Sequence, residues 1–253
     1  MKIRSFVLIG AAVALSAFGE DVTPTQVLGV MKVESANAYT IVAVPWLGVG
    51  GGAVQVSKLV QTTNLSENDW LHVYNASTKT YSSWKLVSNA WTPTVNASVE
   101  GMVMAAGAAD ATIPVGSALW IYRQDTSKPF YLYGQYTNAI SQTLSTGTTS
   151  EPVWNMIANP NATAFNLNTD THKFAGAEGD SIQVPGTNGV DRAYTYSAGA
   201  WGYQKKTVTT KTVGGKERTV TSYSRETEDC TIPPGVGCWY VSTGNTLTTI
   251  TWR

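Results

Sequence analysis

The chain has 253 residues, of which 43% are apolar and 13% are charged, and its formal net charge is zero. Nine tryptophans and 12 tyrosines accompany 17 basic and 17 acidic residues. This composition excludes a disordered chain, and the lack of excess positive charge argues against nucleic acid as a partner, because phosphate binding requires a basic surface.

The first 19 residues have the pattern of a secretory leader. Lys2 and Arg4 precede an apolar run over 5–17. Ala17 and Gly19 then place small side chains at the −3 and −1 positions of a signal-peptidase cleavage site. A membrane anchor is the alternative, but the run is shorter than the about 20 residues that a spanning helix needs. We expect cleavage after 1–19 and export to the periplasm, the cell surface or the extracellular space, with no membrane span in the mature chain.

The mature chain is patterned as β-strands, because short β-branched and aromatic runs alternate with clusters of Gly, Asn, Ser and Pro and helical periodicity is nearly absent. The runs are Thr40–Pro45, Trp70–Tyr74, Tyr81–Val87, Leu119–Tyr122, Phe130–Tyr133, Ala193–Tyr196 and Cys238–Val241. Turn residues between them place the strands in antiparallel hairpins or meanders. The predicted fold class is therefore all-β.

Four sequence blocks recur in the same order roughly 110 residues apart, which is the signature of an internal repeat. The sharpest is a Thr-Ile-Pro-x-Gly turn after an Asp, at 110–116 and again at 229–235, followed by Trp120 and Trp239 respectively. The others match Tyr39–Pro45 with Trp154–Pro160, Asn68–Val73 with Gly179–Val184, and Tyr81–Trp91 with the stretch that ends at Trp201.

These blocks predict two similar antiparallel β-sandwich or barrel-like repeats over 20–138 and 151–253. The weakly patterned polar stretch 139–150 is the predicted linker. The alternative arrangement has the two copies packed against each other about a pseudo-twofold axis.

The second copy carries an insertion over 204–225, in which two alternating Thr/Val strands flank Gly214-Gly215. This pattern predicts a protruding β-hairpin. Its six basic residues suggest a ribbon that faces solvent or a partner. The alternative is a simple charged hairpin whose lysines discourage pairing at its edges.

The two-copy pattern resembles uncharacterised exported β-repeat proteins of verrucomicrobial bacteria. The resemblance rests on the aromatic-start strand that ends in Pro, the Asp before an alternating strand, and the late Ile-Pro-x-Gly-x-x-x-Trp segment. It implies a periplasmic, surface or secreted protein and assigns no activity. The first copy departs from the pattern at Val115, where the second has Pro234.

Cys230 and Cys238 lie eight positions apart in a chain expected to reach an oxidising compartment, which favours a disulfide. Two buried free thiols are the alternative. These cysteines and the two histidines, His72 and His172, lack the spacing of zinc ligands, so we expect no metal site and no cofactor.

Catalytic motifs are weak throughout. No Gly-x-Ser-x-Gly elbow accompanies His72 or His172, which argues against a serine hydrolase. The repeat relates Asp69 to Asp180 and Asp110 to Asp229, and a pseudo-twofold axis could join two such carboxylates for aspartic-type peptidase chemistry, or for glycoside hydrolysis at larger separation. The Asp-Thr/Ser-Gly signature is missing, and the competing interpretation is that Asp69 and Asp180 cap turns.

Binding is the remaining class of function. Trp46, Trp84, Trp91 and Trp201 border turns and are nominated to stack on sugar rings, whereas Trp120 and Trp239 are expected to fill the two cores. The predicted function is an exported, noncatalytic β-repeat protein with a binding or structural role at the cell surface, toward glycans, mucin or other surface proteins. An aspartic-type peptidase acting on mucin-like glycoprotein is the alternative.

Overall fold

The computed structural model of the chain describes residues 6–7, 28–34, 38–48, 53–97, 102–135, 140–169, 174–185, 192–244 and 249–252. Within these residues the protein consists of β-strands and one four-residue helix, α1 (Val56–Leu59), which confirms the all-β class. The leader predicted over 1–19 lies outside the described residues except for β1 (Phe6–Val7). His172 also lies outside them.

The first half contains a large sheet in the order β3-β10-β5-β6-β7, with β8 beside β6. Its strands are β3 (Tyr39–Ala43), β10 (Ala118–Tyr122), β5 (Trp70–Asn75), β6 (Thr80–Val87), β7 (Ala90–Pro93) and β8 (Met104–Ala106). Side chains alternate between its faces. Along β5, Leu71 and Val73 face the main core, whereas Tyr74 packs on the opposite face.

The second half contains a large sheet in the order β13-β20-β15-β16-β17-β18. Its strands are β13 (Val153–Ala158), β20 (Gly237–Ser242), β15 (Ser181–Val184), β16 (Arg192–Ser197), β17 (Ala200–Val213) and β18 (Lys216–Glu226). In both halves the first strand of the large sheet pairs with the strand that follows the Pro-Gly turn, which in turn pairs with the strand that follows a buried Asp. The seven predicted runs all lie within strands or at their ends.

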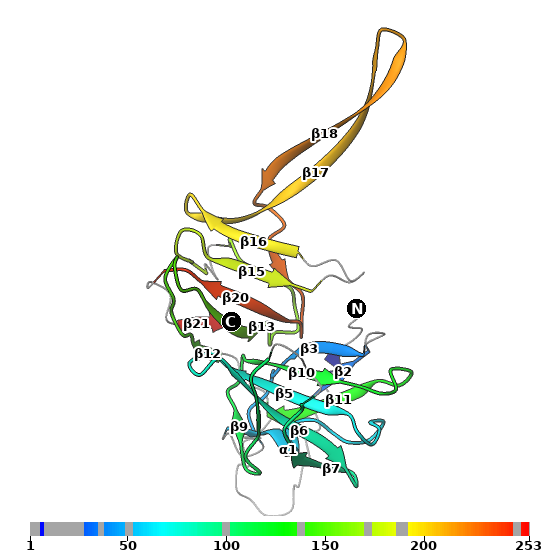
Figure 1. Cartoon of the computed structure of the whole chain (residues 1–253), viewed down its shortest axis with the longest axis vertical. Helices are drawn as coiled ribbons and strands as arrows, with labels where there is room; N and C mark the ends of the chain where they lie inside the picture. The colour runs from blue at the N-terminus through cyan, green and yellow to red at the C-terminus, as the bar shows by residue number, and fades with distance from the viewer. Residues whose placement is uncertain are drawn as a thin grey trace, which may run out of the picture.

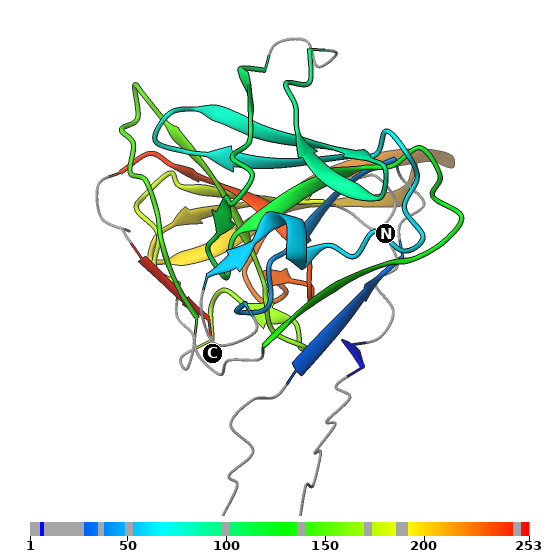
Figure 2. The same ribbon diagram turned by 90° about the horizontal axis from the view of Figure 1, so that it is seen from below.

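Smaller sheets cover one face of the large ones, and the main hydrophobic core lies between the two layers (Figure 2). They pair β1 with β2 and β2 with β11, β12 with β21, β4 with β9, and β14 with β19. Their remaining strands are β2 (Leu28–Val33), β11 (Phe130–Gln135), β12 (Ile140–Thr143), β21 (Thr249–Trp252), β4 (Val54–Gln55), β9 (Thr112–Ile113), β14 (Phe165–Asn166) and β19 (Thr231–Ile232). Each half therefore has one large sheet and two small sheets that cover one of its faces. None of these sheets closes into a barrel.

The prediction of a polar linker over 139–150 is wrong for the start of this stretch, because residues Ile140–Thr143 form β12. Ile140, Gln142 and Leu144 are buried while the residues between them are exposed. The buried positions follow the two-residue period of a strand, and the amide of Gln142 at a core-facing position hides that period in the sequence.

The two large sheets meet at the edges formed by β3 and β13 (Figure 1). The amide N–H of Ala43, at the end of β3, donates to the carbonyl of Gly235 in the second Pro-Gly turn (3.0 Å). Reciprocally, the N–H of Ala158, at the end of β13, donates to the carbonyl of Gly116 in the first such turn (3.0 Å). Two isolated β-bridges, Val42–Val236 and Ser117–Ile157, lie one residue away from these bonds. Each half therefore contributes a strand end and a Pro-Gly turn to the junction.

Gly237 marks the closest approach of the two halves. A Cβ atom at this position would lie 2.2 Å from Cγ2 of Ile41 and 2.7 Å from Cβ of Ala118, both in the first half. Because these distances are far below van der Waals contact, the junction requires glycine here.

Strands β17 and β18 form a two-stranded antiparallel ribbon from the Tyr203–Glu226 pair to the Val213–Lys216 pair. Gly214 and Gly215, at φ of 60° and 76°, form the turn at its tip. The ribbon projects from the body of the molecule (Figure 1), and every residue from 204 to 225 is exposed. We call residues 204–225 the arm.

The predicted disulfide is absent, and Cys230 and Cys238 are buried free thiols. Cys230 lies just before β19, and Cys238 lies inside β20 beyond the Pro-Pro-Gly turn. Both side chains are fully buried in the main core. Burial raises the pKa of the Cys230 thiol to about 11 and raises that of Cys238 as well, which keeps both protonated and unreactive at neutral pH.

Reducing agent should therefore leave the thermal unfolding midpoint of the purified protein unchanged, within about 1 °C. Titration with a thiol reagent without reductant should detect essentially no thiol in the native protein and both thiols after denaturation. Failure to detect thiols after denaturation, combined with a lower midpoint in reductant, would show that the two cysteines are bonded.

Candidate functional site

The four tryptophans nominated for ligand stacking are core residues, so that prediction is wrong. Trp46, Trp84, Trp91 and Trp201 are between 0% and 7% exposed. The indole N–H groups of Trp84, Trp91 and Trp201 donate to backbone carbonyls inside the protein. A position beside a turn does not reveal which side of the sheet a ring occupies, and these rings lie on the buried side.

Trp120 and Trp239, which were expected to fill two separate cores, instead meet at the junction of the halves. Both are partly exposed, and their ring centroids lie 6.1 Å apart in an edge-to-face arrangement. Tyr74 contacts Trp239 at 5.1 Å, and Tyr81 stacks on Trp120 at 5.7 Å. These rings lie on the face of the large sheets opposite the main core.

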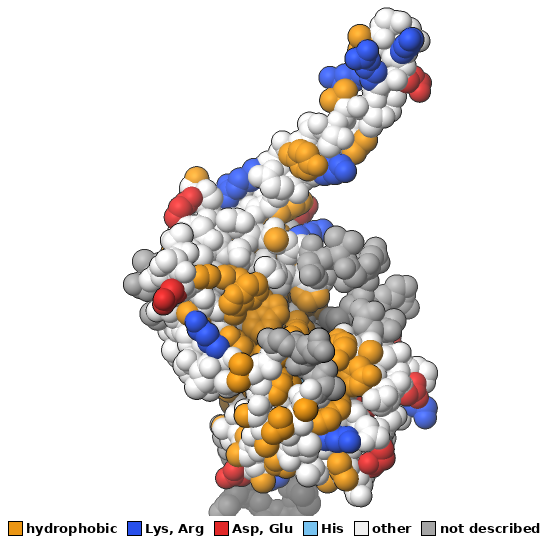
Figure 3. Space-filling model, viewed as in Figure 1, with side chains coloured by type: hydrophobic (Ala, Val, Ile, Leu, Met, Phe, Trp, Pro, Cys, Tyr) orange, Lys and Arg blue, Asp and Glu red, His pale blue; other side chains and the backbone are white. Residues whose placement is uncertain are grey.

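The ring contacts continue into one cluster that spans both halves. We call it the junction aromatic cluster; its members are Tyr39, Tyr74, Tyr81, Trp120, Tyr122, Trp154 and Trp239. Tyr39 is 53% and Trp154 39% exposed, so the cluster reaches the surface at two equivalent strand positions. Figure 3 shows apolar side chains gathered on this face, over β3, β10, β13 and β20.

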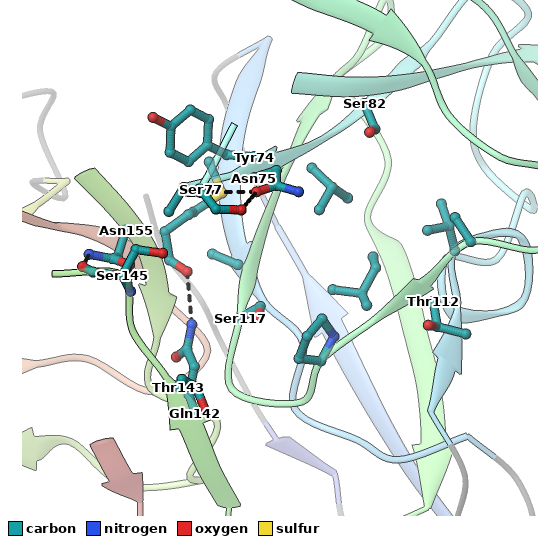
Figure 4. Close-up of a pocket in the computed structure, with 18 of the residues that line it drawn as sticks. Tyr74, Asn75, Ser77, Ser82, Thr112, Ser117, Gln142, Thr143, Ser145 and Asn155 are labelled. Carbon is teal, nitrogen blue, oxygen red and sulfur yellow. Dashed lines mark hydrogen bonds between the residues drawn. The ribbon is translucent and has the colours of Figure 1, made fainter. Parts of the chain in front are cut away.

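A cleft of about 360 Å³ lies beside the cluster, between the two halves (Figure 4). One wall comes from the end of β5, the β5–β6 turn and β6, including Tyr74, Asn75 and Ser82. A second comes from the β9–β10 connection, and a third from β12 and β13, which carry Gln142 and Asn155. Hydroxyl and amide groups from segments far apart in the sequence therefore converge on one space.

Gln142 gives the cleft an unsatisfied polar atom. Its side chain is 7% exposed, and its Nε2 donates to the carbonyl of Met156 at 3.1 Å. Its Oε1 has no hydrogen-bond partner among the described residues. A buried acceptor without a donor is costly, by about 1–3 kcal/mol, so a ligand hydroxyl placed there would restore a lost interaction.

The electrostatic character of the cleft is neutral. Its described lining consists of apolar, aromatic, hydroxyl and amide side chains, and no acidic, basic or histidine side chain among the residues that the structure describes contributes to it. Asn75 is held in place because its Oδ1 accepts from the N–H and Oγ of Ser77, at 3.0 Å and 2.7 Å. The described lining therefore offers hydrogen bonds and ring faces to a ligand.

Asp69 lies in the turn that precedes β5 and is fully buried. Its Oδ2 accepts from the N–H of Ser66 at 2.9 Å, and its Oδ1 accepts from the N–H of Gln124, just after β10, at 2.7 Å. Burial raises the pKa of this carboxyl, while the two N–H donors and the nearby guanidinium of Arg123 oppose that shift. The side chain ties the turn to the end of a neighbouring strand.

Asp180 occupies the same place before β15 and is also fully buried. Its Oδ2 accepts from the N–H of Ala177 at 2.7 Å and from the hydroxyl of Tyr240. Its Oδ1 accepts from the N–H and the hydroxyl of Thr243, just after β20, at 2.7 Å and 3.0 Å. Both turns also contain a residue of positive φ immediately before the Asp, namely Asn68 at 71° and Gly179 at 88°.

The four aspartates nominated for catalysis thus fall into two groups. All hydrogen-bond partners of Asp69 belong to the first half, those of Asp180 belong to the second, and no hydrogen bond among the described residues joins the two. Asp110 and Asp229 are exposed on the turns before β9 and β19. The structure gives Asp69 and Asp180 the turn-capping arrangement.

Comparison with protein-family models, with curated proteins and with solved structures finds no significant match. Function must therefore be argued from the cleft, the junction aromatic cluster and the capping carboxylates.

The residues that the structure describes contain no group of three or more His, Cys, Asp or Glu side chains that could hold a metal ion. They also contain no helix long and apolar enough to cross a membrane.

Sequence reasoning missed the residues that form the cleft and the exposed part of the cluster. The signal for Tyr39 and Trp154 was present, since both begin matched repeat blocks, but their exposure depends on which face of the sheet they occupy. Nothing in the sequence indicated that Gln142 lines a cleft, because a polar residue within a polar stretch is typical of a linker.

Proposed function

We propose that this protein is an exported, noncatalytic binding protein built from two copies of one β-repeat, and that its junction cleft binds a neutral, polyhydroxylated ligand such as a glycan chain. The observation that carries the proposal is the buried Oε1 of Gln142, which has no partner among the described residues, in a cleft whose described lining is uncharged. The leader pattern at residues 1–19 supports export.

The matched architecture of the two halves supports the repeat. The strand order is the same in the two large sheets, and the reciprocal bonds of Ala43 and Ala158 have the form of a twofold-related contact. Asp69 and Asp180 also share a hydrogen-bonding pattern. Each accepts from a backbone N–H that lies just after β10 or β20, respectively. Two copies packed about a pseudo-twofold axis explain all three features.

The chemistry of the cleft favours a sugar among neutral ligands. A pyranose presents several hydroxyls, which donate and accept, and an apolar C–H face that stacks on an aromatic ring. Gln142 Oε1 supplies a free acceptor, Asn75 and Ser82 supply further polar groups, and Tyr74 supplies a ring at the edge of the same space. Mucin-type glycoproteins carry ligands of this class.

The peptidase alternative requires two carboxylates on one water molecule in an accessible cleft. The turn-capping bonds of Asp69 and Asp180 and their complete burial weigh against that use. The binding proposal instead uses a buried acceptor that no described donor satisfies, in a cleft with further hydroxyl and amide groups, and we prefer it for that reason.

Binding can be measured by isothermal titration calorimetry with neutral oligosaccharides released from mucin, after screening on immobilised glycans. We expect Gln142→Leu to weaken binding by about tenfold, the value of one hydrogen bond to a neutral partner. We expect Tyr74→Ala to weaken it by a similar factor through loss of ring contact. Gln142→Leu should change the free energy of unfolding by less than about 1 kcal/mol, because it removes an unsatisfied acceptor along with one good bond.

Gln204→Leu is the matched control, because it makes the same substitution at an exposed position on the arm. It should leave binding unchanged. If the wild-type chain binds no glycan, or if Gln142→Leu binds as tightly as wild type, the cleft is not the site. Release of peptide or sugar fragments by wild type, but not by an Asp69→Asn/Asp180→Asn variant, would instead establish the carboxylate enzyme.

A further inference from the structure

The arm lacks the packing that normally stabilises β-structure. Its ten cross-strand pairs, from Gln204–Arg225 to Val213–Lys216, contact one another, and no side chain of the arm is buried. An isolated two-stranded hairpin is only marginally stable in water, because neither face is covered. The base is held by Arg225, whose Nη2 donates to the carbonyls of Ala200 at 2.8 Å and Ser197 at 3.0 Å, but this anchor does not extend along the ribbon.

The arm also exposes apolar surface and two open edges. Four of the ten large hydrophobic side chains that are exposed in the described part of the chain lie on it, namely Val208, Val213, Val220 and Tyr223. Among the described strands, none pairs with the outer edge of either long strand of the arm, so backbone N–H and C=O groups are exposed along both edges. Exposed β-branched residues beside open edges are features that another protein surface would cover.

Charge identifies the kind of partner. Lys211 and Arg218 lie directly opposite each other in the ladder, and Lys216 lies on the same face two pairs nearer the tip. Like charges directly opposite are destabilising, and the adjacent Glu217 faces the other side of the ribbon. Within the described residues these three cations form no ion pair. A negatively charged partner would relieve their repulsion.

The rest of the same chain has the complementary charge. The arm holds six of the 17 basic residues and one of the 17 acidic residues, which leaves 11 basic and 16 acidic residues elsewhere. The arm therefore carries a net charge of +5 and the remainder −5, although the arm projects away from its own body (Figure 1). Such an arrangement suits contact between molecules rather than within one.

We propose that the arm docks onto the acidic body of a second copy of this chain, so that the protein self-associates through its hairpin. The contact covers the apolar residues of the ribbon and neutralises the cations at its tip. The proposal is independent of the ligand in the cleft.

Sedimentation velocity over a range of protein concentrations tests the proposal. Wild type should form dimers or larger assemblies at about 50 mM salt, and raising the salt to about 500 mM should weaken them, because exposed charges are screened. A Lys211→Gln/Lys216→Gln/Arg218→Gln variant should associate at least tenfold more weakly. Replacing residues 207–222 with Asn-Gly, which keeps the anchored base of the arm, should abolish association.

The matched control removes three exposed cations from the body, as Lys58→Gln/Lys79→Gln/Lys128→Gln. It should associate as well as wild type or better, because the body becomes more acidic. Hydrogen exchange of the arm amides should slow with rising protein concentration in wild type and in this control. Wild type that stays monomeric at low salt, or assemblies that survive shortening of the arm, would overturn the proposal, and sedimentation of a monomeric chain with anionic vesicles would assign the arm to a membrane instead.

Discussion

Replacing Asp180 with Ala should lower the free energy of unfolding by about 4 kcal/mol, because hydrogen bonds to a carboxylate contribute about 1.5–3 kcal/mol each and several are lost together. The substitution leaves the N–H groups of Ala177 and Thr243 and the hydroxyl of Tyr240 without their acceptor. These donors are close to a fully buried site, where water cannot replace the carboxylate at low cost. Urea unfolding followed by tryptophan fluorescence measures the loss.

Asp229→Ala is the control for this prediction, because Asp229 is exposed and its substitution should change stability by less than about 0.5 kcal/mol. Asp69→Ala should resemble Asp180→Ala, since it removes the acceptor of the N–H groups of Ser66 and Gln124. A fully stable Asp180→Ala protein would contradict the capping role. If the Asp180→Ala protein kept its stability but lost a hydrolytic activity of wild type, the result would favour the aspartic-type enzyme.

Stability should also fall as the pH is lowered from about 6.5 to about 4, by up to about 3 kcal/mol, because of His72. The side chain is 1% exposed, and burial lowers its pKa to about 4. Between pH 4 and 6.5 the unfolded chain binds a proton at this histidine and the folded protein does not, so acid favours unfolding. Below about pH 4 both states are protonated and the loss levels off.

Urea denaturation of wild type and His72→Gln at several pH values from 7.5 to 4 isolates this contribution, because every other titrating group is present in both proteins. Among these is Asp69, whose raised pKa acts in the opposite direction at the acid end. The variant should lose the part of the pH dependence that lies between 4 and 6.5. Parallel stability curves for the two proteins would show that His72 is not buried neutral in the native state.

Local sequence was sufficient for much of the secondary structure. The run Trp70–Tyr74 became β5 (Trp70–Asn75), and Leu119–Tyr122 became β10, because β-branched and aromatic residues between turn formers have few alternatives. The turn at Asn75 was also readable, since its side chain accepts from the N–H groups of Ser77 and Thr78, which is the ordinary behaviour of Asn in turns.

Errors arose wherever the answer depended on which face of a strand is covered. Trp84 and Trp201 were expected at the surface and are buried, whereas Trp120 and Trp239 were expected in cores and meet at the junction. Alternation along a strand sorts side chains into two sets, but it does not say which set faces the core when both contain aromatic residues.

The sequence by itself determined the all-β class, the positions of the main strands and the pattern of matched blocks, because these depend on residue periodicity and turn chemistry over short distances. Only the tertiary structure decided that Cys230 and Cys238 stay unbonded, that Gln142 belongs to a strand, and that a neutral cleft opens between the halves. These features depend on side chains that are distant in sequence and are placed together by strand register and by the packing of one sheet edge on another, which no local pattern encodes.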